Sequence, residues 1–204
     1  MIPNATVQRL STIYSLLEHE DFTCLTHISS WKIGEVLGVL PHTVRKDINF
    51  LGDIGRLGKG YPIDRLRSLI TKELGITKRK AAVIGLGKIG SAIMNYENFS
   101  SSDIEIVAGF DSDINRIDTI KTKIPLFASR QISEIVQDKN IEIAFLTSSP
   151  ESARTCFERL EEGGIKAILN FTPIFMASDK IHIRNMDLGL EATILSAMIG
   201  LDDI

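Results

Sequence analysis

The sequence contains little of what would mark a secreted or membrane protein. Only two of its 204 residues are cysteines, Cys24 and Cys156; this gives no indication of a disulfide framework, and we expect both thiols to act as small buried apolar groups. The longest apolar runs, such as residues 141–146, are too short to cross a bilayer. The N-terminus has neither the basic stretch nor the apolar run of a signal peptide. We therefore expect a cytoplasmic protein that does not bind a membrane.

Charge of one sign does not dominate either, since 23 Lys and Arg residues stand against 26 Asp and Glu, for a formal net charge of -3. The charges are unevenly distributed, however: residues 1–79 carry a net charge of +3, and the remainder carries -6. Nucleic-acid phosphates are held by clustered Lys and Arg side chains. The basic segment is therefore the place to look for DNA contacts.

Apolar residues follow two different periods along the chain. Before residue 80 they recur three or four positions apart, which is typical of amphipathic helices. After it, short β-branched runs alternate with segments long enough for a helix, which is typical of a parallel sheet with crossover helices. The runs cover residues 81–85, 104–110, 141–147, 165–171 and 181–186. We predict an α/β protein with a helical domain over 1–79, a parallel-sheet domain over 80–186 and a C-terminal helix over 187–204.

Within the helical domain, residues 28–51 have the outline of a helix-turn-helix: one helix, a tight turn at Gly38 and a second helix that begins at Pro41. Apolar side chains of the second helix share one arc, which we expect to be buried: Leu40, Val44, Ile48 and Leu51. Side chains that can read bases and phosphates share the opposite arc: His42, Arg45, Lys46 and Asn49. The alternative is an ordinary solvated face, which every amphipathic helix has.

A glycine-rich segment with two cations follows the second helix. Arg56 and Lys59 lie among glycines at positions 52, 55, 58 and 60. Such a hairpin is typical of a wing that lies along the DNA backbone or enters the minor groove. Taken alone it also fits a flexible interdomain loop, an interpretation that its place directly after the helix disfavours.

The first strand of the sheet domain runs into a GxGxxG motif that opens a helix, which is the context that dinucleotide binding requires. Gly85 permits the tight turn, Gly87 lets the backbone approach a pyrophosphate, and Gly90 allows close helix packing. The helix N-terminus favours the negative charge of the phosphates. The loop that would hold them comprises Gly85, Leu86, Gly87, Lys88, Ile89 and Gly90.

Asp111 follows the second run of the sheet domain, 21 positions after Gly90. A carboxylate at this place accepts hydrogen bonds from a ribose 2′-hydroxyl and repels a 2′-phosphate, which predicts NAD(H) rather than NADP(H) as the ligand. A fold that has lost its ligand, or that binds another adenine compound, is the alternative.

Catalysis has no support in the sequence. About 90 residues follow Asp111, and all are needed to complete the sheet and its helices, so that no substrate domain remains. His182 is the only histidine after residue 80, and it lies in an alternating run where a surface position is the simpler interpretation. We assign no catalytic residue and no metal ligand.

The C-terminal segment has apolar residues on most of its circumference, at positions such as Leu188, Ile194 and Ile199. A helix of this kind has to be covered on several sides. Another subunit or the rest of its own domain can supply that cover, and the pattern favours neither.

Four segments together resemble the Rex family of redox-sensing repressors of bacteria, and the resemblance extends over almost the whole chain. They are the IPNATVQRL start, the VRKD helix with the FLGDIG...GKGY segment behind it, the GLGKIG...NYENF segment and the ILNFTP...NMD run. The resemblance implies a winged helix-turn-helix domain followed by a Rossmann domain. It also implies a homodimer, with the C-terminal helix swapped onto the partner, that binds a palindromic DNA operator with NAD and leaves it with NADH.

On the DNA side, the resemblance implies that Arg45 and Lys46 contact the operator. In the wing, Leu57 stands where the family usually has a basic residue, and Lys59 can compensate for it.

On the nucleotide side, the resemblance implies that the glycine loop and Asp111 hold the adenosine and pyrophosphate. Tyr96 falls on a tyrosine implicated in telling NADH from NAD, and Phe171 and Pro173 would line the pocket near the nicotinamide. The alternatives are a helix-end aromatic packed on the core for Tyr96 and ordinary strand-end packing for the other two.

Two departures concern the coupling of nucleotide to DNA. The family commonly pairs an arginine of the first helix with the aspartate that matches Asp187, whereas the first-helix position here is Ser15, so that this ion pair cannot form. The strand end that usually reads Thr-Val-Pro has an additional serine between Thr147 and Pro150, which makes this edge of the pocket more polar. These departures bear on how strongly NADH is discriminated from NAD, not on the fold or on DNA binding.

We therefore expect a repressor that senses the NADH/NAD ratio. Two other functions fit part of the pattern: an NAD-dependent oxidoreductase with a helical dimerisation domain, and a repressor whose Rossmann domain only dimerises.

Overall fold

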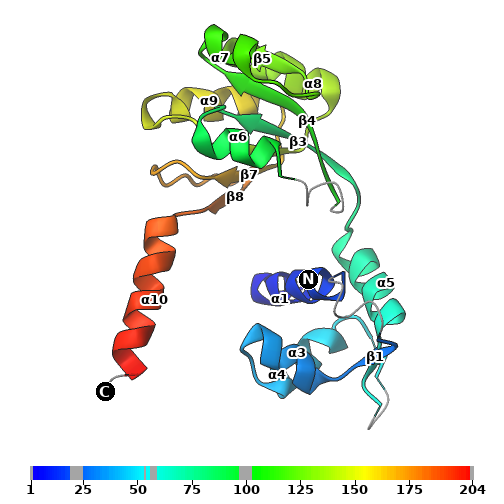
Figure 1. Ribbon diagram of the computed structural model, residues 1–204. Coiled ribbons are helices and arrows are strands. Elements are labelled where there is room, and N and C mark those ends of the chain that lie inside the picture. The colour runs from blue at the N-terminus through cyan, green and yellow to red at the C-terminus, as the bar shows by residue number, and fades with distance from the viewer. Residues whose placement is uncertain (1, 19–24, 53, 56–58, 97–102, 203–204) are drawn as a thin grey trace. The chain divides into compact units, whose positions relative to one another are not determined.

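The structure, a computed structural model, separates into two compact units, Met1–Thr77 and Lys78–Ile204. Figure 1 shows the elements of both units, coloured in chain order from blue at the N-terminus to red at the C-terminus. The separation falls two residues before the boundary expected from the sequence, and each unit has an apolar core of its own. The residues that the structure describes are 2–18, 25–52, 54–55, 59–96 and 103–202.

The N-terminal unit consists, in its described part, of helices and a small sheet. β1 (His27–Ile28) pairs antiparallel with β2 (Tyr61–Pro62). The helices are α1 (Asn4–Leu17), α3 (Ser30–Leu37), α4 (Pro41–Asn49) and α5 (Ile63–Leu74). Their inward side chains form one core, whose members include Leu10, Ile13, Ile33, Val44, Leu66 and Ile70.

The predicted helix-turn-helix is present as α3 and α4. α3 ends at Gly38, whose φ of 64° is a left-handed conformation that glycine adopts at little cost. α4 begins with Pro41, at a position where the missing N–H of proline is no loss. The expected apolar arc is buried at Val44, Ile48 and Leu51. The expectation for Leu40 was wrong: its side chain is 64% exposed, because Leu40 is the extended residue before α4 and does not follow the helical period.

The C-terminal unit contains, in the described residues, a six-stranded sheet of order β5-β4-β3-β6-β7-β8. Every pairing in it is parallel. All five predicted runs form strands, but β5 was missed, because a half-buried strand of three residues shows no periodicity. The strands are β3 (Arg79–Ile84), β4 (Ile104–Asp111), β5 (Leu126–Ala128), β6 (Ile143–Leu146), β7 (Ala167–Asn170) and β8 (His182–Asn185).

Helices cover both faces of this sheet. α8 (Ile132–Lys139) and α9 (Pro150–Glu162) contribute to the core on one face, and α6 (Lys88–Met94) contributes to the core on the other. The chain order reverses between β3 and β6, since one half of the sheet grows from β3 to β5 and the other from β6 to β8. In such sheets a ligand binds in the crevice at the carboxyl ends of the strands beside this reversal. Cys156 of α9 is buried as expected, and Cys24 lies outside the described residues.

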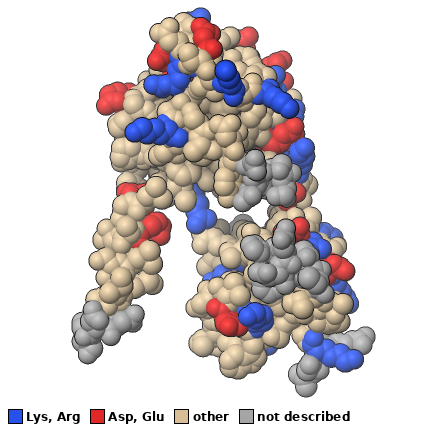
Figure 2. Space-filling view, viewed as in Figure 1, with Lys and Arg blue, Asp and Glu red and all other residues tan. Residues whose placement is uncertain are grey.

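α10 (Leu188–Asp202) follows β8 and is not covered by the rest of its own unit. Residues 188–201 are all exposed, and the large apolar side chains among them are Leu188, Leu190, Ile194, Leu195, Met198, Ile199 and Leu201. Figure 2 shows few charged side chains along this helix. The alternative of a helix buried within its own domain was therefore wrong. Among the described helices, α10 included, none is long and apolar enough to cross a membrane.

Candidate functional site

The polar face of α4 is exposed, as the helical spacing predicts. The exposed polar side chains are His42, Arg45, Lys46 and Asn49. Arg45 Nη1 donates a hydrogen bond of 3.1 Å to Oγ of Ser30, the first residue of α3. Ser29 already caps α3 by accepting a hydrogen bond of 3.1 Å from the N–H of Lys32. The hydroxyl of Ser30 therefore accepts a hydrogen bond from Arg45, while Ser29 caps the helix.

A buried carboxylate fastens α4 to α1. Asp47 is 2% exposed and accepts hydrogen bonds from Arg9 Nε at 2.5 Å, from Arg9 Nη2 at 2.8 Å and from Thr6 Oγ1 at 2.8 Å. Burial by itself would raise the pKa of Asp47, but the hydrogen bonds from Arg9 and Thr6 and the charge of Arg9 bring this pKa below its usual value. Asp47 is thus ionised and forms a bidentate ion pair.

A signal for this anchor is present in the sequence, although Asp47 was not among the predicted functional residues. Asp47 falls on the same helical arc as Val44 and Ile48, both of which are buried. A charged residue on an apolar arc has to find a partner inside the protein.

The wing is described only in part. Arg56 and Leu57 lie outside the described residues. Lys59 is exposed in a turn that precedes β2. Gly60 has a φ of 76°, and a Cβ at this position would lie 2.5 Å from the carbonyl oxygen of Ile28, so glycine is required where the segment returns to β1. DNA contacts by this segment stay a prediction.

The glycine loop connects β3 to α6 at the carboxyl end of the sheet. Gly85 has a φ of 94°, and a Cβ there would lie 2.6 Å from Cα of Ser148. A Cβ at Gly90 would collide with the carbonyl oxygen of Gly85 and lie 2.7 Å from Oγ1 of Thr147. By contrast, a Cβ at Gly87 would meet nothing within 4 Å. The fold therefore requires Gly85 and Gly90, whereas Gly87 borders open space that a ligand can use.

The other loop residues divide into a buried one and two exposed ones. The side chain of Leu86 is 2% exposed and belongs to the core beneath α6, so that only its backbone faces the loop. Lys88 and Ile89 are exposed at the start of α6.

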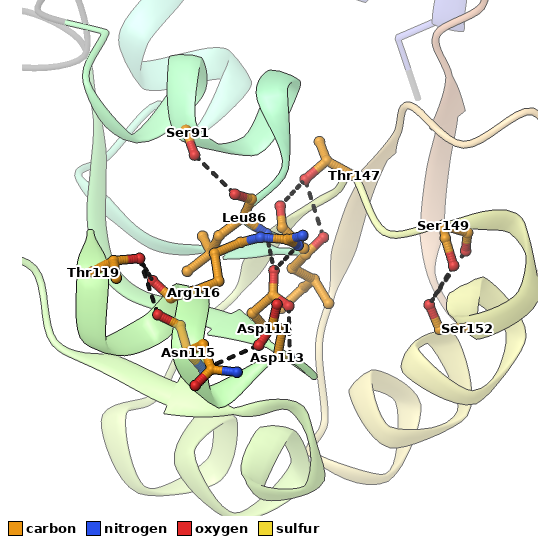
Figure 3. A network of polar contacts seen from close by, with 12 residues as sticks. Leu86, Ser91, Asp111, Asp113, Asn115, Arg116, Thr119, Thr147, Ser149 and Ser152 are labelled. Atoms are coloured by element: carbon orange, nitrogen blue, oxygen red, sulfur yellow. Dashed lines mark hydrogen bonds and ion pairs between the residues drawn. The ribbon is translucent and has the colours of Figure 1, made fainter.

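Asp111 lies at the end of β4, where its carboxylate is 4% exposed and already partnered (Figure 3). Oδ2 accepts hydrogen bonds from the N–H of Leu86 at 2.7 Å and from Arg116 Nη1 at 2.9 Å, and Oδ1 accepts one from the N–H of Asp113 at 2.9 Å. Burial by itself would raise the pKa of Asp111, but the two N–H groups and the guanidinium of Arg116 lower it below its usual value.

Arg116 changes what Asp111 can offer to a ligand. A carboxylate has about four lone-pair sites, of which three are used here, so one site on Oδ1 remains for a ribose hydroxyl. A second hydrogen bond from the ribose requires Arg116 to move. Arg116 belongs to α7 (Ile114–Thr119), and the sequence analysis did not single it out.

These groups border a cavity of about 240 Å³ at the carboxyl ends of β3, β4 and β6. Thr147 follows β6, on the other side of the chain-order reversal from the glycine loop. Its hydroxyl donates a hydrogen bond to the carbonyl oxygen of Gly85 at 2.6 Å and lies 3.1 Å from the carbonyl oxygen of Ile84. Burial raises the pKa of the Cys156 thiol, which also lines the cavity. The crevice that the topology predicts therefore contains the glycine motif, Asp111 and Thr147.

The described residues that line this cavity do not include the three residues expected near a nicotinamide. Tyr96 follows α6 and is 54% exposed, so it is not packed into the core. Phe171 is half-buried and Pro173 is exposed, both just after β7. Buried Asn170 holds this segment, because its Nδ2 donates to the carbonyl oxygen of Ile174 at 2.6 Å. Ligand contacts by these three residues stay a prediction.

Asp187 and Ser15 lie in different units. Asp187 Oδ1 accepts hydrogen bonds from the N–H groups of Gly189 at 2.8 Å and Leu190 at 3.1 Å, and so it caps the first turn of α10. Ser15 is exposed on α1. His182 is exposed at the first residue of the edge strand β8, whereas the crevice lies at the carboxyl ends of β3, β4 and β6. A switch role for Asp187 and Ser15 stays a prediction, and the cap was not foreseen.

The fold and the site together define a class of protein. A helix-turn-helix unit with an exposed polar face on its second helix is joined to a Rossmann unit. The crevice of the Rossmann unit presents a glycine loop and a buried aspartate, which is the arrangement that binds a dinucleotide.

Comparison with known proteins identifies the family. Residues 1–49 match the family "Putative DNA-binding protein N-terminus", and residues 76–174 match "CoA binding domain". The redox-sensing transcriptional repressor Rex of Listeria welshimeri is 31% identical over 192 residues, which are 93% of this chain and 89% of that protein. The chain belongs to the Rex family of redox-sensing transcriptional repressors.

Solved structures agree with this assignment. The crystal structure of RSP, a Rex-family repressor, in complex with NAD+ and operator DNA matches with a TM-score of 0.86 at 28% identity, over 100% of this chain and 94% of that one. The RSP complex with NADH matches with a TM-score of 0.85 at 26% identity, over 100% and 96%.

Proposed function

We propose that the protein is a transcriptional repressor that senses the NADH/NAD ratio: as a homodimer it binds a palindromic operator in double-stranded DNA, and NADH releases it. The observation that carries this proposal is the likeness, over the full length of the chain, to RSP in its complexes with operator DNA and with NADH. The geometry of each unit supports one half of the proposal.

DNA binding is assigned to residues 1–79, which carry a net charge of +3. The exposed polar face of α4 enters the major groove, where arginine and asparagine can pair with base edges, and the wing follows the phosphate backbone. The assigned residues are His42, Arg45, Lys46, Asn49, Arg56 and Lys59.

NADH and NAD binding is assigned to residues 80–186. The pyrophosphate lies over Gly87, where the backbone leaves open space. The adenosine ribose donates to the remaining site on Oδ1 of Asp111. The nicotinamide lies toward the ends of β6 and β7, within reach of Thr147, Tyr96, Phe171 and Pro173.

The homodimer is assigned to residues 187–204. α10 exposes seven large apolar side chains that the rest of its own unit does not cover, and a partner subunit that receives this helix removes them from water.

The dinucleotide acts as an effector and is not turned over. The relative from Listeria is named as a repressor, and His182 lies at the start of the edge strand β8, away from the carboxyl ends of β3, β4 and β6 that border the crevice. Because a repressor shares a compartment with the DNA it binds, we place the protein in the cytoplasm.

NADH acts by changing the spacing of the two recognition helices in the dimer, so that they no longer match the palindrome. An effector shifts such an equilibrium only as far as its affinity differs between the two states. A tenfold release requires a difference of about 1.4 kcal/mol.

A mobility-shift titration tests the proposal, on a palindromic duplex that the protein itself selects from a random library. At fixed salt, NADH should release the protein and NAD should not. If both nucleotides or neither change DNA binding, redox sensing is wrong. Operator binding without NADH affinity would show that the Rossmann unit only dimerises, and consumption of NADH without DNA binding would show an oxidoreductase.

A further inference from the structure

α4 carries an exposed reading face and a buried anchor on consecutive residues. Arg45 and Lys46 are exposed, whereas Asp47 is 2% exposed and bonds to α1. Neighbouring residues of a helix differ by about 100° around its axis. Any rotation of α4 that took Asp47 away from Arg9 would carry Arg45 and Lys46 with it.

The hydrogen bonds of Asp47 depend on direction, whereas the apolar contacts of the surrounding core do not. Apolar contacts such as those of Val44 and Ile48 are not directional, so they tolerate small rotations of a helix. The guanidinium of Arg9 instead bonds both carboxylate oxygens of Asp47, and Thr6 donates a third hydrogen bond. A bidentate pair of this kind has a fixed geometry.

We propose that Asp47, Arg9 and Thr6 are positioning residues, which set the rotation of the recognition helix and so determine which bases it reads. They act through α4 and do not contact DNA. This inference rests on the proposed DNA-binding function. It predicts that loss of the anchor lowers the preference for one DNA sequence over another, because base contacts need exact placement whereas phosphate contacts depend mainly on charge.

Arg67 provides a matched control for Arg9. Its side chain is 30% exposed, against 29% for Arg9, and it forms ion pairs with Glu18 at 2.6 Å and Asp64 at 3.3 Å. These partners belong to α5 and to the end of α1, not to α4. Arg9→Gln and Arg67→Gln therefore remove the same charge from the same unit, and only the first releases the recognition helix.

The experiment compares the full-length parent chain with Arg9→Gln, Arg9→Lys and Arg67→Gln. The probes are a duplex that the parent selects from a randomised palindromic library and a scrambled duplex of the same length and composition. We expect Arg9→Gln to lower the ratio of the two affinities about tenfold and Arg67→Gln to lower it less than about twofold. Arg9→Lys should lower the affinity ratio by an intermediate factor, because lysine keeps the positive charge but cannot form the bidentate pair.

A second readout separates positioning from stability. Library selection repeated with Arg9→Gln should return altered or relaxed base preferences, and selection with Arg67→Gln should return those of the parent. If Arg9→Gln does not fold, Thr6→Val carries the same comparison, with an expected loss of about threefold in the affinity ratio.

Three results would overturn the proposal. Equal losses of preference in Arg9→Gln and Arg67→Gln would show that the ion pair only stabilises the fold. Unchanged preference in Thr6→Val and Arg9→Gln would show that packing alone positions α4. A parent chain that prefers no duplex would instead contradict the DNA-binding function, and the positioning role with it.

Discussion

Each unit of the molecule contains a buried aspartate held by an arginine, and the two differ in what surrounds them. Asp47 is 2% exposed and bonded only to side chains, those of Arg9 and Thr6, among the described residues. Asp111 is 4% exposed, bonded to two backbone N–H groups and to Arg116, and it lines a cavity. Both carboxyl groups have a lowered pKa.

The difference shows that burial, an arginine partner and a lowered pKa do not by themselves make a binding site. In the Rossmann unit the buried carboxylate borders the space that a ligand would occupy. In the N-terminal unit the residues that face outward are Arg45 and Lys46, and the buried carboxylate holds the helix that carries them. Four experiments test this difference between the two units.

The largest effect is expected from Asp47→Ala, which leaves Arg9 and Thr6 without their partner. The free energy of unfolding should fall by about 3 kcal/mol, at the low end for a broken buried ion pair because Arg9 keeps some contact with water. Denaturant unfolding of the full-length chain measures it. Asp64→Ala is the control: this carboxylate is 97% exposed, and its loss should change stability by less than about 0.5 kcal/mol. Equal unfolding of the two variants would show that the Asp47 pair adds nothing.

Gly87→Val should weaken NADH binding by a free energy of nearly the same size. A Cβ here would meet no protein atom within 4 Å, and a valine side chain would occupy the space assigned to the pyrophosphate. Calorimetric titration should show about 100-fold weaker binding of NADH, or about 2.7 kcal/mol, with unchanged unfolding. Gly90→Ala is the contrast, since its Cβ collides with Gly85 and should destabilise the fold as well. Normal NADH affinity in Gly87→Val would place the pyrophosphate elsewhere.

Acid should reveal both carboxylates as contributors to stability. Because their pKa values are lower in the folded chain than in the unfolded one, their contribution is complete at neutral pH. It declines below the usual aspartate pKa of about 4 and is lost as the pH falls through the folded pKa. The free energy of unfolding should fall as the pH drops below about 4, and less steeply in Asp47→Ala. Parallel pH curves for the parent and this variant would contradict the lowered pKa of Asp47.

The smallest effect is expected from Ser30→Ala, which removes only the exposed hydrogen bond to Arg45. Preference for the selected duplex over the scrambled one should fall about twofold, or about 0.5 kcal/mol, with little change in unfolding. Ser29→Ala is the matched control: it removes the cap of α3 and should cost about 1 kcal/mol of stability. If Ser30→Ala kept the parent's preference for the selected duplex over the scrambled one, Arg45 would need no support from α3.

Much of the fold could be predicted because its determinants are local. The turn at Gly38, the start of α4 at Pro41 and the β-branched runs each depend on neighbouring residues. Where local pattern was weak or misleading, prediction failed: β5 has three residues, and Leu40 precedes α4 although its spacing matches the period of that helix.

The candidate site divides in the same way. Spacing located the glycine loop and Asp111, and the structure places both at one cavity. Spacing did not predict that Arg116 pairs with Asp111, or that Arg9 pairs with Asp47, which is 38 residues away in the chain. It also could not show that the side chain of Leu86 is buried while a Cβ at Gly87 would meet open space.

Local patterns in the sequence were enough to predict the order of the elements other than β5, the two kinds of unit and the residues that turn outward on α4 or lie in the glycine loop, because periodicity and turn chemistry act over a few residues. Only the tertiary structure decided which charges meet. The partners of Asp47 and Asp111 come from other elements, and an ion pair depends on a distance of a few ångströms that chain spacing does not specify.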